Sequence, residues 1–274
     1  MRRTHLLAAG LACAVAACSS TSSPTGTSAL DNSAITADLS SVAADDIGTD
    51  VDLMTGMDGG LGNLSADYQG AIVAPNYHFK PNLTGCTFAN GSFTCPATRQ
   101  NGLTITRVIT FYDAGGNPQD GYDSLTTASI NVVADISGDI THGPWSATVV
   151  RHRDFTITGL AGDETERTVN GSGSESVSKS RVLRNDSTRS YDITGNSTLA
   201  DIVFPVGPNG GNLWPTSGTI TRNYTITLTS GPNAGKTVTR TVVITFSGGL
   251  TASATINGVP YTIDIAGHSA TPQG

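Results

Sequence analysis

Arginine is the candidate functional residue type of this sequence, because it recurs at strand positions where the alternating pattern predicts an apolar side chain. Several segments alternate apolar and polar residues, as half-buried β-strands do, and an arginine takes a place in the apolar set of each. The arginines concerned are Arg107, Arg151, Arg153, Arg222 and Arg240. A guanidinium group on the buried, apolar face of a sheet must form an ion pair or extend into water. Around a concave cavity, these side chains could bind an anionic headgroup, a phosphate or a carboxylate.

The alternative is that these arginines are structural. They could lie near strand ends with their head groups in water, or pair with acids such as Glu175. If the loop at 230–235 sets Leu228 opposite Val238, Arg222 and Arg240 are four residues apart along the strands, about 13 Å. Such arginines are spread out rather than clustered, so the spacing favours the structural role.

Motifs for catalysis and for metal binding are mostly missing. The sequence has no Gly-x-Ser-x-Gly, no His-Glu-x-x-His and no phosphate-binding glycine loop. His142 and His152 are scattered, and only a cleft that gathers one of them with a carboxylate and a hydroxyl would indicate a hydrolase. Asp46, Asp50 and Asp52 could offer oxygens to Ca²⁺, but turn and helix-cap roles explain them better. We expect no catalytic residue, no metal and no cofactor.

A ten-residue stretch, CTFANGSFTC at 86–95, predicts a disulfide-closed hairpin. Asn90-Gly91 is the preferred pair for a two-residue type I′ loop. A fold at that point places Cys86 opposite Cys95 in a pair without backbone hydrogen bonds, where the Cα atoms approach to about 4.5 Å. This separation lies within the range that a disulfide tolerates, so we expect the two cysteines to be bonded.

The N-terminus carries an export signal. Arg2 and Arg3 precede an uninterrupted run of apolar and small residues from Leu6 to Ala17, and Cys18 follows. The run is too short and too early to be a membrane-spanning helix. Export to an oxidising compartment agrees with a disulfide elsewhere in the chain.

The residues at 15–18, Val-Ala-Ala-Cys, resemble the lipobox of bacterial lipoproteins, with valine where that family prefers leucine. The resemblance implies that residues 1–17 are removed and that Cys18 carries a diacylglyceryl anchor, followed by a Ser/Thr-rich tether at 18–30. Ser19 then implies the outer membrane of the cell envelope. The alternative is an ordinary cleaved signal and a soluble secreted product.

The first part of the mature chain is acidic. No Lys or Arg lies between Arg3 and Lys80, whereas eight aspartates lie between Asp31 and Asp67. This charge argues against nucleic acid as a partner and against electrostatic docking on anionic lipid. The acyl chains, rather than charge, are therefore expected to hold the protein at the membrane.

Residues 31–57 contain the helical pattern of the chain. Apolar residues recur there at helical spacing: Ile35, Leu39, Val42 and Ala43. Gly48 is expected to end this helix, and Thr49 with Asp52 has the spacing of a capping box that would begin a second one, which Gly56 ends. We expect one or two short N-terminal helices that lie on a sheet.

From residue 70 onward the period is two almost throughout, which predicts about a dozen antiparallel strands. The pattern places apolar residues on the buried face of the sheet and threonines on the solvent-exposed face. The apolar residues include Leu103, Ile105, Ile226 and Ile244. Residues 31–274 then form a single mainly β domain, a wide curved antiparallel meander of half-barrel or barrel-like form. This architecture resembles the half-barrel with a helical lid of LolA-like lipoprotein carriers, without a matching sequence signature.

Together these patterns predict a lipid-anchored cell-envelope protein that is a non-catalytic binding or scaffolding module. The expected partners are the membrane, through the acyl chains, and an apolar or amphipathic ligand such as a lipid. Two alternatives stay open. One is a purely structural envelope lipoprotein whose sheet interior is filled, and the other is a hydrolase whose residues meet only in space.

Overall fold

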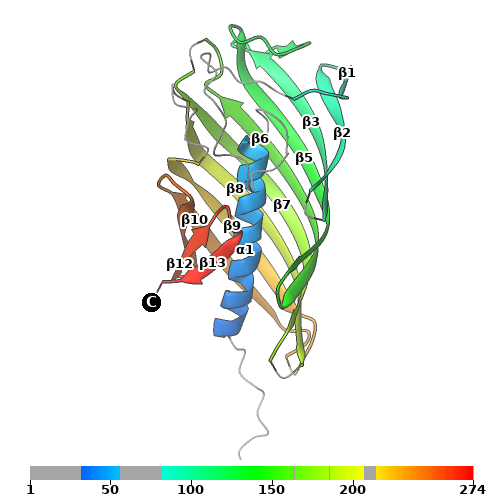
Figure 1. Cartoon of the computed structure of the whole chain (residues 1–274), viewed down its shortest axis with the longest axis vertical. Helices are drawn as coiled ribbons and strands as arrows, with labels where there is room; N and C mark the ends of the chain where they lie inside the picture. The colour runs from blue at the N-terminus through cyan, green and yellow to red at the C-terminus, as the bar shows by residue number, and fades with distance from the viewer. Residues whose placement is uncertain are drawn as a thin grey trace, which may run out of the picture.

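The computed structural model describes residues 32–55, 82–100, 102–162, 164–184, 186–206, 214–231 and 233–273. The expected signal peptide at 1–17, the anchor at Cys18 and the tether at 18–30 lie outside the described residues. Within them, one helix lies inside a wide curved sheet (Figure 1). The helix is α1 (Asn32–Thr55), and the strands are β1 (Thr87–Ala89), β2 (Ser92–Gln100), β3 (Leu103–Asp113), β4 (Pro118–Gln119), β5 (Thr127–His142), β6 (Trp145–Thr158), β7 (Glu166–Val182), β8 (Thr188–Pro205), β9 (Ser217–Leu228), β10 (Thr237–Phe246), β11 (Thr251–Ile256), β12 (Val259–Asp264) and β13 (Ser269–Pro272).

The sheet is a meander in which each strand pairs antiparallel with its neighbour in the chain. Its order is β1-β2-β3-β5-β6-β7-β8-β9-β10-β11-β12-β13, and β4 pairs with β3 off this path. Among the described residues β1 and β13 do not pair with each other, so the sheet is curved but open. The predicted fold class, a mainly β protein built on a wide curved antiparallel meander, is confirmed.

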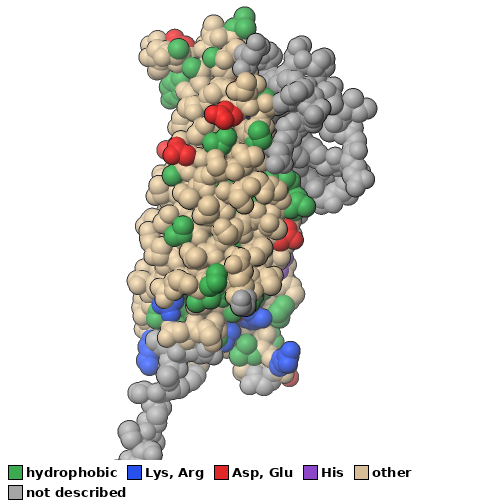
Figure 2. Space-filling model, turned by 90° about the vertical axis from the view of Figure 1, so that its left-hand side faces the viewer, with side chains coloured by type: hydrophobic (Ala, Val, Ile, Leu, Met, Phe, Trp, Pro, Cys, Tyr) green, Lys and Arg blue, Asp and Glu red, His purple; other side chains and the backbone are tan. Residues whose placement is uncertain are grey.

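Alternation of side chains sets the two faces of the sheet, as the period of two predicts. In β6, every odd-numbered residue is buried and every even-numbered residue is exposed. Leu103, Ile105, Ile226 and Ile244 are all buried in the core, as expected. Figure 2 shows an outer face made mostly of uncharged polar side chains and backbone. The hydrophobic core therefore lies in the concavity, where α1 covers it.

The helix differs from its prediction. One or two short helices were expected, with a break at Gly48, and the structure has one helix, α1, that is continuous over 24 residues. Gly48 is retained inside the helix because the ring of His268, from the β12–β13 turn, lies directly against it, and a Cβ at Gly48 would collide with that ring. The Thr49 hydroxyl donates to the carbonyl of Asp45 (2.9 Å) instead of capping a new helix. The glycine thus serves close packing rather than helix termination.

The predicted hairpin is confirmed. Cys86 and Cys95 form a disulfide with a Cα–Cα distance of 4.0 Å. Asn90 and Gly91 both have positive φ, 52° and 81°, as a type I′ turn requires. The pairs between them follow the expected register, with Thr87 opposite Thr94 and Phe88 opposite Phe93, all four within 87–94.

The register of β9 with β10 corrects the expected one by two residues. Val238 lies opposite Ile226, and Val242 lies opposite Arg222. The reason is a shorter connection, since Leu228 exchanges backbone hydrogen bonds with Gly235 and Lys236, two residues before the expected partner Val238. A slip of two residues keeps every side chain on its face, so the buried set is unchanged. It places Arg222 and Arg240 two residues apart along the strands rather than four.

Replacing Gly48 with alanine tests the close packing of α1. Alanine has the higher helix propensity by about 1 kcal/mol, yet we expect Gly48→Ala to destabilise the protein by about 1 kcal/mol or more, because the methyl group displaces the His268 ring. Urea unfolding measures the difference. In a His268→Ala background the same change should be stabilising. Stabilisation of the otherwise unchanged protein by Gly48→Ala would show that the ring does not constrain the helix.

Candidate functional site

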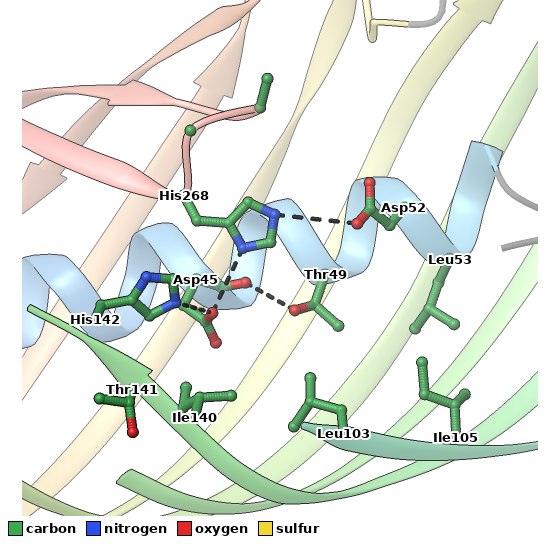
Figure 3. Close-up of a pocket in the computed structure, with 12 residues that line it drawn as sticks. Asp45, Thr49, Asp52, Leu53, Leu103, Ile105, Ile140, Thr141, His142 and His268 are labelled. Atoms are coloured by element: carbon green, nitrogen blue, oxygen red, sulfur yellow. Dashed lines mark hydrogen bonds and ion pairs between the residues drawn. The ribbon is translucent and has the colours of Figure 1, made fainter. Parts of the chain in front are cut away.

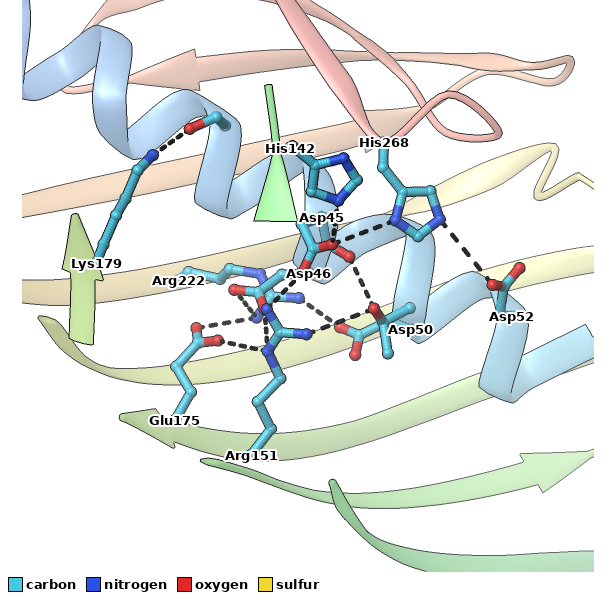
Figure 4. A network of polar contacts seen from close by, with 12 residues as sticks. Asp45, Asp46, Asp50, Asp52, His142, Arg151, Glu175, Lys179, Arg222 and His268 are labelled. Atoms are coloured by element: carbon cyan, nitrogen blue, oxygen red, sulfur yellow. Dashed lines mark hydrogen bonds and ion pairs between the residues drawn. The ribbon is translucent and has the colours of Figure 1, made fainter. Parts of the chain in front are cut away.

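Two polar groups of residues lie side by side along α1. The first is a pocket between the helix, β3, β5 and the β12–β13 turn (Figure 3). The second, which we call the charge cluster, lies between the helix and the middle of the sheet (Figure 4). Asp45 belongs to both, because it contacts histidines of the pocket and an arginine of the cluster.

The charge cluster joins three aspartates of α1 to three arginines and one glutamate of the sheet. Its members are Asp45, Asp46, Asp50, Arg151, Arg153, Glu175 and Arg222, and all of them are buried. β6 supplies two of the arginines, β9 supplies the third, and β7 supplies the glutamate. Each of these four side chains holds an inward position of its strand, so the period of two directs all of them at the helix.

Ion pairs connect the helix to each arginine. Arg151 Nη2 lies 2.7 Å from Asp45 Oδ2, and Arg153 Nε lies 2.7 Å from Asp50 Oδ1. Arg222 contacts the other oxygen of Asp50. One aspartate therefore binds the arginines of two strands, β6 and β9, that are separated in the sheet by β7 and β8.

Glu175 and Asp46 complete the cluster at its centre. Arg222 Nη1 lies 3.2 Å from Glu175 Oε1, and Arg151 Nε lies 2.5 Å from Asp46 Oδ1. Tyr224 donates its hydroxyl to Asp46 Oδ2 at 2.9 Å. Every member thus contacts an oppositely charged group, which is the condition for a charge to be tolerated in a protein interior.

One carboxyl group of the cluster has a raised pKa. Burial and the neighbouring Glu175 raise the pKa of Asp46 to about 7, against the opposing charges of Arg151 and Arg222. Burial also raises the pKa of Glu175, but the hydrogen bond with Asp46 and the charge of Arg222 outweigh it and lower the pKa to about 2. With the proton on Asp46, three guanidinium groups face three carboxylates, so the formal charges balance.

The sheet leaves room for these large side chains. Gly173 of β7 and Gly195 of β8 hold inward positions beside the cluster. A Cβ at Gly173 would lie 2.8 Å from Arg153 Cδ, and one at Gly195 would lie 2.7 Å from a ring carbon of Tyr224. Glycine at these two places therefore makes the space that the arginine and tyrosine occupy.

A second set of contacts ties the first turns of the helix to the sheet. Asp38 receives Arg181 Nη1 at 2.7 Å and Arg189 Nη2 at 2.6 Å. The Asp38 carbonyl accepts from Lys179 Nζ at 2.5 Å, and that amino group lies 4.4 Å from the centre of the Trp145 ring. Burial lowers the pKa of Lys179 to about 8. The helix is thus held by ion pairs near both ends.

The structure brings three of the five predicted arginines together and leaves two apart. Arg151, Arg153 and Arg222 meet in the charge cluster, and the pairing with Glu175 that the sequence offered as the alternative is confirmed. Arg240 lies outside it and donates to Asn32 Oδ1 at 2.6 Å. Arg107 is buried elsewhere on the concave face, and burial lowers its pKa. A ligand role for these arginines stays a prediction.

Sequence reasoning missed the partners of the arginines. Turn and cap roles were expected for Asp46, Asp50 and Asp52, and the aspartates of this segment were otherwise read only as an acidic first part of the mature chain. The available signal was their spacing. Asp38, Asp45 and Asp52 recur every seven residues and Asp46 and Asp50 are four apart, so all five lie on one side of a helix.

The pocket has a volume of about 470 Å³ and two contrasting walls (Figure 3). One wall is apolar and comes from α1, β3 and β5, and its residues are Leu53, Leu103, Ile105 and Ile140. The other wall is polar and combines α1 with His142 of β5 and His268 of the β12–β13 turn, and its helical residues are Asp45, Thr49 and Asp52. A pocket of this kind suits a ligand that has one apolar and one polar part.

The polar wall consists of two histidines and two carboxyl groups. His268 Nδ1 lies 3.4 Å from Asp45 Oδ1, and His268 Nε2 lies 4.0 Å from Asp52 Oδ2. His142 Nε2 lies 3.6 Å from the same oxygen of Asp45. His268 therefore bridges two carboxyl groups that stand two helical turns apart, with Gly48 beneath its ring.

The two carboxyl groups differ in their surroundings. Burial raises the pKa of Asp45, but the hydrogen bond with His268 and the charge of Arg151 outweigh it and lower that pKa to about 2. Burial raises the pKa of Asp52, whose one nearby cation is the more distant His268. The pKa of His268 is raised in turn, chiefly by its hydrogen bond with Asp45. Among the described residues, Asp52 therefore has fewer cationic partners than Asp45.

Other chemistry is limited within the described part of the chain. No group of three or more His, Cys, Asp and Glu side chains there is arranged to bind a metal ion. His152 lies outside the pocket, on the outer face of the sheet, with Nδ1 2.8 Å from Asp135. None of the helices in the described ranges has the length and hydropathy of a membrane span.

Replacing one arginine of the cluster tests its role in stability. We expect Arg222→Met to lower the free energy of unfolding by about 3–5 kcal/mol, because it leaves Asp50 and Glu175 buried with fewer opposite charges. Arg240→Met is the matched control on the next strand, and we expect a loss below about 1 kcal/mol because its side chain is partly exposed. Chemical denaturation measures both. Equal effects of the two substitutions would contradict a role for the cluster.

The His268 bridge predicts a pH dependence. The folded pKa of His268 is raised, so its contribution is complete below about pH 6.5 and is lost as the pH rises through the folded pKa. Asp45 and Asp52 face the ring from the helix, together with Arg151 behind Asp45. We expect His268→Asn to cost about 1 kcal/mol more at about pH 5.5 than at about pH 8.5.

The matched control for this pH dependence is His152→Asn, because that ring lies on the outer face beside an exposed acid. Urea unfolding at the two pH values measures the difference for each variant. A loss of stability in His268→Asn that is the same at both pH values would show that the ring packs on the helix without an ionic contribution.

Comparison with known proteins gives no relative for this chain. No protein family model, no curated protein and no solved structure matches it. The geometry of the pocket and of the charge cluster is therefore the basis for any functional interpretation.

Proposed function

We propose that the chain is a lipid-anchored protein of the bacterial cell envelope whose curved sheet and helix form a non-catalytic binding module for an amphipathic ligand. The observation that carries the proposal is the pocket with one apolar wall and one wall of carboxyl groups and histidines. Its volume of about 470 Å³ lies in the range of sites for small organic ligands.

The lipid anchor is supported by the lipobox-like residues that end at Cys18. The described structure begins at Asn32, which follows this cysteine by 32 − 18 = 14 residues. A Ser/Thr-rich segment of this length joins an acylated cysteine to a folded domain without a spanning helix.

The polar wall favours a ligand head that donates hydrogen bonds or carries a positive charge. Asp45 is already engaged by two histidines and Arg151, whereas the one ion pair of Asp52 among the described residues is the distant contact with His268. An ammonium head near Asp52 would supply the missing partner, and the alkyl part would lie against Leu53 and Ile105. Anion binding by the clustered arginines does not form part of the proposal, because their guanidinium groups are buried and paired.

Catalysis is not proposed, although His142 and a carboxylate share the pocket with a hydroxyl. The Thr49 hydroxyl donates to the carbonyl of Asp45 within the helix, and it accepts from Arg151 Nη1 at 3.4 Å. It is therefore directed away from the histidine rings, so the arrangement lacks the activated nucleophile of a hydrolase.

Two amphiphiles of equal chain length test the pocket. We expect dodecylammonium, titrated calorimetrically below its micelle concentration, to bind about tenfold more tightly than dodecanoate, since one ion pair in a partly buried site contributes about 1.4 kcal/mol. Asp52→Asn should remove this preference. Asp135→Asn, on the outer face, is the matched control and should leave it unchanged.

Equal affinities for the two probes, or an unaltered preference in Asp52→Asn, would contradict the pocket assignment. The anchor is checked separately on membrane-extracted protein. Denaturing mass spectrometry should show a diacylglyceryl mass on Cys18, and its absence would contradict the anchor without bearing on the pocket.

A further inference from the structure

Positive charge collects at one end of the molecule, the end at which α1 begins. Seven described Lys and Arg side chains are exposed or half-buried, and five of them lie at this end. They are Arg181, Arg184, Arg189, Lys236 and Arg240. Figure 2 shows the blue side chains gathered at the lower end of the molecule on that face, with most of the red ones above them. We call these five residues the basic end.

Backbone contacts show that the basic end is one continuous surface. It is formed by the turns that join β5 to β6, β7 to β8, and β9 to β10. Val182 donates to the carbonyl of Pro144, which links the first turn to the second, and Thr229 donates to the carbonyl of Ser190, which links the second to the third. Arg240 reaches the first residue of the helix, Asn32. The start of the helix and the three turns therefore share one end.

The acids at this end do not neutralise it. Asp38 is buried and shared between Arg181 and Arg189, whose side chains are 33% and 25% exposed. Asp186 is the exposed acid of the β7–β8 turn, beside the exposed Arg184. The exposed Asp139 of β5 and Asp192 of β8 lie close to the same turns, in one register row with Thr227 and Thr237. Five cations against four carboxylates leave a small excess of positive charge at this end of a chain whose formal charge is −7. Of the other helix aspartates, Asp45, Asp46 and Asp50 are buried in the charge cluster and Asp52 lines the pocket.

We propose that the basic end rests on the anionic phospholipid headgroups of the membrane that holds the lipid anchor, contrary to the expectation from the acidic first part of the sequence, because the exposed Lys and Arg gather at one end. This inference depends on the anchor of the proposed function, because the chain from Cys18 must enter the domain at the start of α1. Each Lys or Arg near an anionic bilayer adds to binding, and the attraction extends for about a Debye length, about 10 Å. Docking would set the long axis of the domain upright on the bilayer.

The side chains of the basic end are also of the types that bind phospholipid headgroups. Arg184 and Lys236 are exposed at the tips of neighbouring turns, and Arg181 and Arg189 hold part of their guanidinium groups in solvent. Arginine forks bind phosphate oxygens through two donors, and lysine supplies a mobile point charge. No apolar side chain has to enter the bilayer, because the acyl chains supply insertion.

The full chain carrying Cys18→Ser tests docking without the anchor. We expect it to co-sediment with vesicles of phosphatidylcholine that contain about 30% phosphatidylglycerol, and to bind pure phosphatidylcholine vesicles about tenfold more weakly. Binding should be lost at about 0.5 M NaCl. Equal binding to both vesicles would overturn the proposal, whatever the mass spectrum shows for Cys18.

A charge-matched pair of variants locates the surface. Arg184→Glu with Lys236→Glu changes the net charge by four units, and we expect it to reduce vesicle binding about tenfold or more. The control makes the same change away from this end, through Arg99→Glu, Thr156→Glu and Thr245→Glu, which lie at exposed positions, and should retain most of the binding. Circular dichroism checks that both variants are folded. Equal losses in the two variants would mean that only net charge matters and would overturn the assignment.

Inorganic phosphate distinguishes a bilayer from a soluble anion as the partner. At matched ionic strength, phosphate should compete with the vesicles no better than chloride, because several cations must act on one extended surface. Competition by millimolar phosphate would assign the basic end to a small soluble anion and would overturn the membrane proposal.

Discussion

The ion pairs between α1 and the concave face of the sheet are the constraint on which the rest of this structure depends. A helix that carried several unpaired aspartates could not be buried, since removing one carboxylate from water costs several kcal/mol. The sheet meets the carboxyl groups of four of them, Asp38, Asp45, Asp46 and Asp50, with arginines or a tyrosine. Because Asp50 contacts arginines of both β6 and β9, the helix can neither slide nor turn without losing contacts to two strands at once.

The buried charges also explain why the sheet curves without closing. β1 and β13 do not pair within the described residues, so the concavity must be filled by something other than strand side chains. The helix fills it, and β13 packs alongside the helix. The pocket lies where this filling is incomplete, between the later turns of α1 and the apolar side chains of β3 and β5. The candidate site is thus a consequence of how the helix sits in an open sheet.

Much of the fold could be predicted from the sequence, because it depends on side-chain periodicity and on turn residues, which are local features. Alternation along the described strands, the Asn90-Gly91 turn and the Cys86–Cys95 pair all follow from period and turn chemistry, and all are confirmed. The continuous helix was not accessible. Gly48 is a poor helix former, and only the ring of His268, distant in sequence, explains its place.

The candidate site was the part of the structure that was hardest to predict from the sequence, because it depends on ion pairs between residues that are far apart in the sequence. The arginines on the apolar face were recognised as unusual, yet turn and helix-cap roles were expected for the aspartates that pair with them, because opposite charges on two elements carry no local signal of pairing. The expected distance between Arg222 and Arg240 was wrong for a different reason. The connection between β9 and β10 is shorter than expected and moves the register by two residues, which period alone cannot detect.

The long sequence separations within the charge cluster set the order in which the protein can assemble. The ion pairs of Asp45 and Asp50 with β6 close loops of more than 100 residues, and the pair of Asp50 with Arg222 closes one of 172. Contacts between residues so far apart in the sequence slow folding, because chain entropy must be lost before they form. No Lys or Arg lies between Arg3 and Lys80, so the acidic segment emerges from synthesis with no partner within reach. The acidic segment is therefore among the last parts of the chain to become native, and its aspartates stay hydrated until β6 and β9 have brought their arginines into place.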